Sequence, residues 1–145
     1  MARPIIAIAV LAAATLALSG CNVLAPTRDT EGGIIGEVMM PSTDAWVGDC
    51  FTFVDGSNLA YATVSPCTEP HTHIVIGTGT LSDQRVTYFG TLQIAVLKAC
   101  ETRFELYQGA QETEFVPEYI VSNKKDREGR EITHYSCLVK SSAPA

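Results

Sequence analysis

Hydrophobic residues recur with two different periods along the chain, and these periods predict its elements. Short alternating or β-branched stretches predict strands at residues 50–54, 59–64, 72–81, 115–121 and 132–139. A turn at residues 55–58 (DGSN) joins the first two strands into a hairpin. Apolar residues at every third or fourth position predict a helix with Thr91 as N-cap and Gly109 as C-cap. Its buried stripe is Phe89, Leu92, Val96, Cys100, Phe104 and Tyr107.

These elements predict a small α+β domain, in which one main helix packs across an antiparallel sheet of four or five short strands. The length of 145 residues allows one domain. Residues 82–84 are predicted to form a turn, and the charged residues in 122–131 predict a second, solvated turn.

Cysteine usage predicts two disulfides in this domain. Of five cysteines, Cys21 closes an apolar N-terminus and four remain in the body. Four cysteines allow about three connectivities, and spacing alone does not choose between them. The hairpin brings Cys50 close to Cys67, so we expect that pair. The second pair, Cys100 with Cys137, would then join the helix to the last strand.

The N-terminus has the pattern of a secretory signal, with Arg3 ahead of an uncharged run at residues 4–18. This run is shorter than the roughly 18 residues expected of a membrane-spanning helix. Residues 18–21 (LSGC) resemble a bacterial lipobox, which implies a lipoprotein signal peptide at 1–20, cleavage before Cys21 and lipidation of its thiol. An ordinary signal peptide and an uncleaved anchor are the alternatives.

Residues 21–46 are predicted to be the lipidated cysteine followed by a flexible tether, because glycine, proline and acidic residues break any regular period. Two apolar pieces, 34–35 and 38–40, would either add an edge strand or contact a partner. Trp46 marks the expected start of packing. The disulfide-stapled domain is predicted at 47–140, with a frayed tail at 141–145.

The net charge of the chain and the compartment implied by its disulfides limit which partners are expected. The formal net charge of -6 argues against nucleic acid as a partner. Disulfides persist outside the cytoplasm, so we expect an extracytoplasmic domain attached to the cell membrane through its lipid.

A cluster of Cys67, Glu69, His71 and His73 invites a metal-binding interpretation. An oxidised Cys67 cannot act as a ligand, however, so we predict no metal site and no cofactor. The favoured role is structural, with His71 hydrogen-bonding the turn; Glu69, His71 and His73 are kept as candidate ligand-binding residues. The sequence has no Gly-x-Ser-x-Gly motif, and cysteines in disulfides are not nucleophiles, so we predict that the protein is not an enzyme.

The cysteine frame and its flanking motifs resemble the septum formation family of actinobacterial envelope proteins. The matching stretches are 47–51 (VGDCF), 64–71 (VSPCTEPH), 99–104 (ACETRF), 107–109 (YQG), 129–130 (GR) and 137–138 (CL). The family tends to carry an acid three residues after the histidine, where this chain has Ile74, and a tryptophan ahead of residue 129 that this chain lacks.

The resemblance implies a non-catalytic cell-envelope lipoprotein with a binding or scaffolding role at the outer face of the cytoplasmic membrane. It also implies a link to septum formation and cell division, with envelope or division proteins as partners. The alternative function is an extracytoplasmic carrier of a metal or small ligand that uses His71 and His73.

Overall fold

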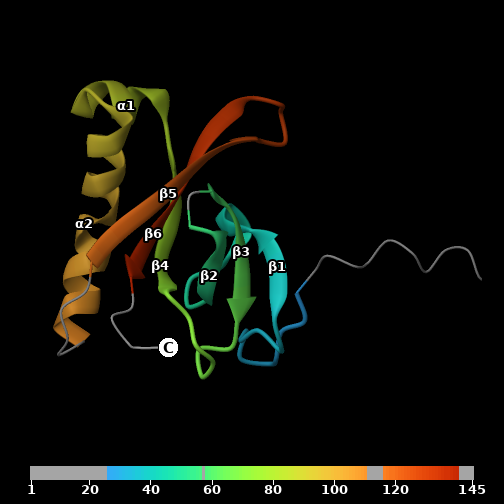
Figure 1. Ribbon diagram of the computed structural model, residues 1–145. Helices are drawn as coiled ribbons and strands as arrows, with labels where there is room; N and C mark the ends of the chain where they lie inside the picture. Colours follow the sequence, from blue (N-terminus) through green and yellow to red (C-terminus); the bar gives the residue numbers. More distant parts are fainter. Residues whose placement is uncertain (1–25, 57, 111–115, 141–145) are drawn as a thin grey trace, which may run out of the picture.

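The computed structural model describes residues 26–56, 58–110 and 116–140. The predicted signal peptide, Cys21 and the predicted tail at 141–145 lie outside these residues. The elements follow in the order β1 (Val38–Pro41), the 3-10 helix η1 (Ser42–Asp44), β2 (Cys50–Asp55), β3 (Asn58–Ser65), β4 (His73–Leu81), α1 (Asp83–Phe89), α2 (Leu92–Ala110), β5 (Val116–Lys125) and β6 (Glu131–Lys140) (Figure 1).

The strands form one six-stranded antiparallel sheet in the order β1-β3-β2-β4-β6-β5. The hairpin of β2 and β3 joins the rest of the sheet where Cys50 and Phe51 pair with Ile74 and His73 of β4. η1 packs against β3, β5 and β6. Because β3 and β5 lie far apart in the strand order, the sheet curls around η1 and has a concave face on that side. The predicted α+β class is confirmed.

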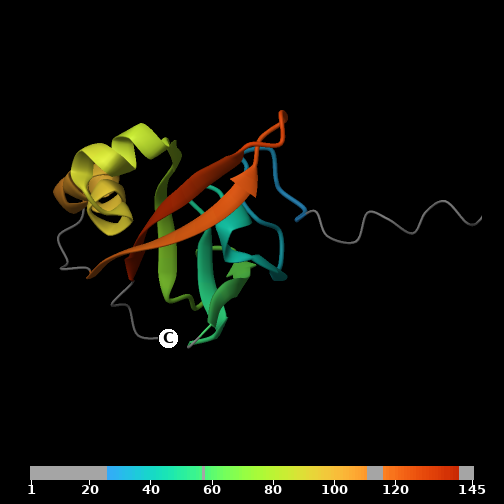
Figure 2. The same cartoon turned by 90° about the horizontal axis from the view of Figure 1, so that it is seen from above.

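Helices α1 and α2 cover the convex face, on the opposite side of the sheet from η1 (Figure 2). Helix α2 contacts β4, β5 and β6. The apolar side chains between the two layers form what we call the helix core. Its buried members are Leu81, Ala95, Val96, Cys100 and Cys137.

The helical region differs from the prediction of one helix. Gly90, with a φ of 85°, ends α1 after Phe89, and α2 begins at Leu92. This left-handed conformation favours glycine and interrupts the helical hydrogen bonds. Thr91 caps α2 as predicted, since its Oγ1 accepts a hydrogen bond from the Ile94 N–H at 3.3 Å. The turn predicted at 82–84 is instead the start of α1, capped by the side chain of Ser82.

Part of the segment predicted as a flexible tether, residues 26–46, belongs to the packed domain. β1 pairs with β3 at the edge of the sheet, which is the edge-strand outcome left open by the sequence. Ile34, Met40 and Ala45 are buried on the concave face. Packing therefore begins well before residue 47, because this segment buries the apolar side chains that the hairpin of β2 and β3 presents on this face.

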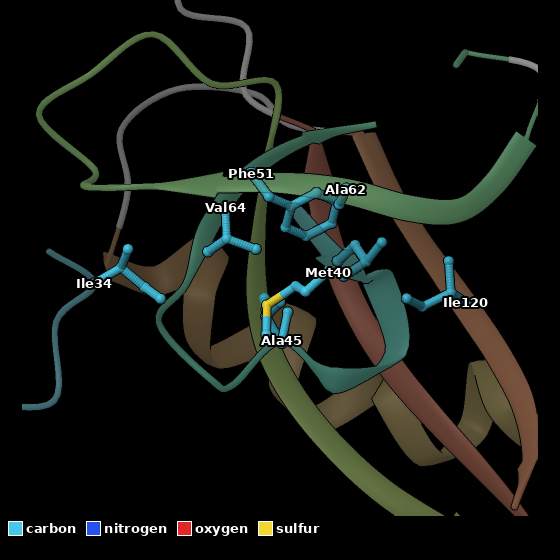
Figure 3. Close-up of a cluster of buried hydrophobic side chains, with 9 residues drawn as sticks. Ile34, Met40, Ala45, Phe51, Ala62, Val64 and Ile120 are labelled. Atoms are coloured by element: carbon cyan, nitrogen blue, oxygen red, sulfur yellow. The ribbon is translucent and has the colours of Figure 1, made fainter. Parts of the chain in front are cut away.

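We call the cluster beneath that cover the concave core. Figure 3 shows several of its side chains converging from the N-terminal segment, β2, β3 and β5. Its buried members are Ile34, Met40, Ala45, Phe51, Ala62, Val64, Val75, Ile120 and Leu138.

Both predicted disulfides are present. Cys50 bonds to Cys67 across a separation of 17 residues, and Cys100 bonds to Cys137 across 37. The first ties the start of β2 to the loop that follows β3, and the second ties α2 to β6. Two disulfides are typical of proteins that fold outside the cytoplasm, so the domain is extracytoplasmic.

Candidate functional site: a polar groove on the concave face

β5 carries polar side chains onto the concave face beyond the concave core. Side chains along a strand alternate between the two faces of a sheet. Ile120 belongs to the concave core, whereas Tyr119 and Val121 pack against the helix core. Ser122 and Lys124 lie two and four residues beyond Ile120, so their side chains point to the same face. The concave face therefore changes from apolar to polar along this strand.

β6 and β4 continue the polar face. Cys137 and Tyr135 point to the helix core, and the alternation along the strand places Ser136 and His134 on the concave face. Thr78 of β4 pairs with Ser136 across the ladder. Hydroxyl groups and an imidazole from neighbouring strands therefore lie side by side.

These side chains line a groove with a volume of about 550 Å³, which we call the concave groove. Residues 43–47, from η1 and the segment after it, form one wall. The sheet supplies the other side. Its lining residues are Thr78, Ile120, Ser122, Lys124, His134, Tyr135 and Ser136.

A buried ion pair fixes the wall of the groove. The Arg28 guanidinium donates to both carboxylate oxygens of Asp49 at 2.7 and 2.8 Å, and their side chains are 11% and 5% exposed. The Asp49 hydrogen bond raises the pKa of Arg28, against the opposing effect of burial. Asp49 also accepts the Trp46 backbone N–H at 2.7 Å. Such bidentate, charge-assisted pairs hold geometry well.

Trp46 is the exposed aromatic residue of this wall. The Arg28 guanidinium carbon lies 4.0 Å from the centroid of its ring, a cation–π contact. The side chain of Trp46 nevertheless stays 59% exposed. Its orientation is therefore fixed from one side while a large apolar surface remains open to a ligand.

The charged groups of the groove neutralise each other. Lys124 Nζ forms an ion pair with the Asp44 carboxylate and donates to the Thr43 carbonyl at 3.3 Å. This contact ties β5 to η1 across the groove. Both side chains stay partly exposed, so the pair offers hydrogen-bond donors and acceptors without an excess of either charge.

Ser122 differs from the other polar groups of the groove. Its Oγ is shielded from solvent and has no hydrogen-bond partner among the described residues. A buried hydroxyl normally has such a partner, so an exception calls for an explanation.

The residues predicted as a ligand set, Glu69, His71 and His73, are not brought together. The His71 ring donates to the Glu69 backbone carbonyl at 2.8 Å, which is the predicted turn contact. His73 instead lies in β4, where it is buried and stacks on Phe51. Within residues 26–56, 58–110 and 116–140, no group of three or more histidine, cysteine or acidic residues is placed to hold a metal ion.

His73 forms a small polar network of its own. Its Nε2 donates to Glu118 Oε2 at 3.0 Å, and its Nδ1 lies 2.7 Å from Thr72 Oγ1. Burial lowers the pKa of His73 below its ordinary value of 6.5, and the Glu118 hydrogen bond only partly offsets that shift. Glu118 was not singled out from the sequence, because the pairing depends on strands 45 residues apart.

A second surface lies on the outer side of α2. Ile94 and Leu97 are exposed there, and a shallow groove of about 330 Å³ runs between this helix and Pro117. It is mainly apolar and lacks the convergent hydroxyl groups of the concave groove. No helix of the described chain is long and apolar enough to span a membrane.

Comparison with protein-family models gave no match, and comparisons with curated proteins and with solved structures gave none either. The groove residues were not predicted as a site: Ser122 and Lys124 fell in a segment predicted as a solvated turn. The alternation of polar residues at 122, 124, 134 and 136 is the signal that could have identified them.

Proposed function

We propose that this protein is a non-catalytic lipoprotein of the cell envelope that binds a ligand in the concave groove. The observation that carries the proposal is the groove itself, which is lined both by Trp46, held against Arg28, and by several uncharged polar residues of the sheet. Binding sites commonly combine apolar surface with a few well-placed polar groups.

The proposed location is the outer face of the cytoplasmic membrane, with Cys21 carrying the lipid. The lipobox at 18–21 and the extracytoplasmic disulfides support this placement. Pro26 follows Cys21 by five residues, a span of at most about 18 Å in extended chain. The packed domain would thus be held close to the membrane surface.

The proposal includes the septum formation class and its link to cell division. It is supported by the resemblance around the four cysteines, which pair first with second and third with fourth. Envelope or division components are then the partners that the groove would meet.

Site-specific photocrosslinking in intact cells of the native host tests this function. A photoreactive residue at Thr80, two positions beyond Thr78 on the same strand face, should give a discrete product with an envelope component. Trp46→Ala in the same chain should abolish that product, because the groove would lose its aromatic wall.

Matched positions on other surfaces serve as controls. The same photoreactive residue at Thr87 of α1 should give no product. A product from Leu97 of α2 but not from Thr80 would place binding on the helix and refute the groove. In parallel, labelling with radioactive palmitate should mark the wild type and not Cys21→Ser, and an unlabelled wild type would refute the lipid anchor.

A further inference from the structure

We propose that the ligand of the concave groove is a neutral saccharide chain. This inference rests on the proposed binding function of the groove and adds the chemical class of the ligand. It follows from three properties of the groove: an aromatic platform, a set of groups that both donate and accept hydrogen bonds, and balanced charge.

The platform is Trp46. One face of the indole is covered by Arg28, yet the side chain remains 59% exposed and lines the groove. An aromatic ring offers a large rigid surface, and the C–H faces of pyranose rings stack on such surfaces. Because Arg28 and Asp49 already fix this residue, little conformational entropy is lost when a ligand binds.

The opposite side of the groove is made of hydroxyl groups and an imidazole. Thr78, Ser122 and Ser136 each supply a hydroxyl, and His134 supplies ring nitrogens. A hydroxyl both donates and accepts hydrogen bonds. This dual capacity matches the hydroxyl groups of a sugar, which have the same capacity.

Ser122 is the residue that most directly indicates such a ligand. Its Oγ is shielded from solvent and lacks a hydrogen-bond partner among the described residues. Because this atom is shielded in the free protein, the Ser122 side chain has to turn toward the groove before a sugar hydroxyl can give it a partner. Leaving such a group unpaired destabilises the free protein, which is the pattern expected of a residue retained for binding.

The charge of the groove favours a neutral ligand over an anionic one. Lys124 is paired with Asp44, and the Arg28 guanidinium is occupied by Asp49. Recognition of carboxylate or phosphate groups usually relies on arginine forks that are free to bind. A neutral polyol can instead use the ion pair as it stands, through one donor and one acceptor.

Fluorescence provides a direct test, because Trp46 is the single tryptophan of the chain. The lipidated full chain in detergent micelles is titrated with cellotetraose and with fully N-acetylated chitotetraose, two neutral tetrasaccharides. We expect a saturable change in Trp46 emission with at least one of them. Tetragalacturonate, the anionic counterpart, should bind at least about tenfold more weakly.

Variants separate hydroxyl recognition from loss of structure. Ser122→Ala should weaken saccharide binding by about tenfold, as expected for one lost hydrogen bond, without lowering the melting temperature. Thr102→Ala, which removes an exposed hydroxyl on α2, should change neither quantity. Equal affinity of the wild type and Ser122→Ala would overturn the assigned role of this hydroxyl.

The inference and the proposed function fail in different ways. If neither neutral tetrasaccharide changes Trp46 emission at millimolar concentration while Thr80 still crosslinks an envelope component, the saccharide assignment is overturned and groove binding stands. A change in Trp46 emission that occurs only with tetragalacturonate also overturns the assignment of a neutral saccharide. If Thr80 gives no crosslink either, the groove is not a binding site.

Discussion

The contribution of a buried polar side chain to stability depends on whether it has a hydrogen-bond partner. Ser42, the first residue of η1, and Ser122 of β5 are matched examples, because both hydroxyls are shielded from solvent. Ser42 Oγ donates to the Leu59 carbonyl, whereas Ser122 Oγ has no partner among the described residues. The same substitution should therefore have opposite effects at the two positions.

We predict that Ser42→Ala lowers the free energy of unfolding by about 1–2 kcal/mol, since it removes the hydrogen bond from the buried Ser42 hydroxyl to the Leu59 carbonyl. Ser122→Ala should leave it unchanged or raise it by up to about 1 kcal/mol, because no hydrogen bond is lost. Urea denaturation of the two variants measures the difference. A large loss of stability in Ser122→Ala would show that its hydroxyl has a structural partner.

Among the charged residues that the structure describes, we predict that Arg28 causes the largest loss of stability when it is replaced. Arg28→Ala leaves the buried Asp49 carboxylate unpaired, and such a change typically lowers stability by about 3–5 kcal/mol. Arg130 provides the control, because its ion pairs with Asp126 and Glu128 are formed by a side chain that is 74% exposed. Arg130→Ala should therefore change stability by less than about 1 kcal/mol. Equal losses in the two variants would contradict the buried pair.

His73 makes stability depend on pH in a known direction. Its pKa in the folded protein is lowered from 6.5 by burial, so the unfolded chain takes up the proton first as pH falls. The stability that neutral His73 contributes is then complete above pH 6.5 and decreases below it, as the pH falls toward the folded-state pKa. Unfolding free energies measured between pH 7.5 and 5.5 should fall for the wild type.

His73→Gln should flatten that decrease, because glutamine does not titrate but still offers a donor to Glu118. His71→Gln leaves His73 in place and should keep the wild-type slope. An unchanged slope in His73→Gln would mean that other groups carry the pH dependence.

At the scale of elements, local pattern was enough for the strands and the disulfides. Alternation identified β2, β3, β4 and β6 almost to their ends, and the hairpin explained why Cys50 meets Cys67. The start of α2 after Thr91 was predicted, but α1 was missed, because residues 82–84 were interpreted as a turn and only Phe89 of this helix was included in the apolar stripe. A helix of seven residues without a fully buried side chain leaves little periodic signal in the sequence.

The N-terminal segment was misjudged for a different reason. Its glycines and prolines do break any regular period, as the sequence indicates. An irregular segment can still be buried, however, when it packs on apolar side chains from strands later in the chain. Ile34 and Ala45 pack on strands that lie later in the chain. The concave groove depends on the same long-range arrangement, since Trp46 and Ser122 come together only when the sheet curls around η1.

We predict that the segment at 26–46 is required for folding. A chain that begins at Val47 would lose Ile34 and Met40, each contributing about 1.5–3 kcal/mol by burial, and would leave Asp49 without Arg28. Stability totals of about 5–15 kcal/mol leave little margin for such a loss. Near-ultraviolet circular dichroism should show no fixed tertiary structure. A chain that begins at Asn22 should fold, and a folded Val47 chain would contradict the assignment of this segment to the domain.

At the scale of the whole molecule, one sheet separates two cores, and the disulfides differ in their relation to them. Cys100 and Cys137 are fully buried members of the helix core. Cys67 lies in the exposed loop that follows β3, although its partner Cys50 is buried. The concave groove lies beside the ion pair of Arg28 and Asp49, so its shape depends on the N-terminal cover more than on either disulfide.

This difference predicts an order of reduction. A reducing thiolate must reach a sulfur atom directly, so dithiothreitol in native buffer should open Cys50–Cys67 first. The Cys100–Cys137 bond should resist reduction until the domain unfolds, because α2 and β6 shield it.

By loop entropy, the Cys50–Cys67 bond stabilises the domain by about 3 kcal/mol and the Cys100–Cys137 bond by about 4 kcal/mol. A domain that has lost the first bond should therefore remain folded if its total stability exceeds about 3 kcal/mol. Timed alkylation followed by mass spectrometry measures the order, with and without urea. Simultaneous reduction of both bonds in native buffer would contradict this order. It would show either that the helix layer opens readily or that the domain needs the Cys50–Cys67 bond to stay folded. A Cys50→Ser, Cys67→Ser variant that remains folded would support the first explanation.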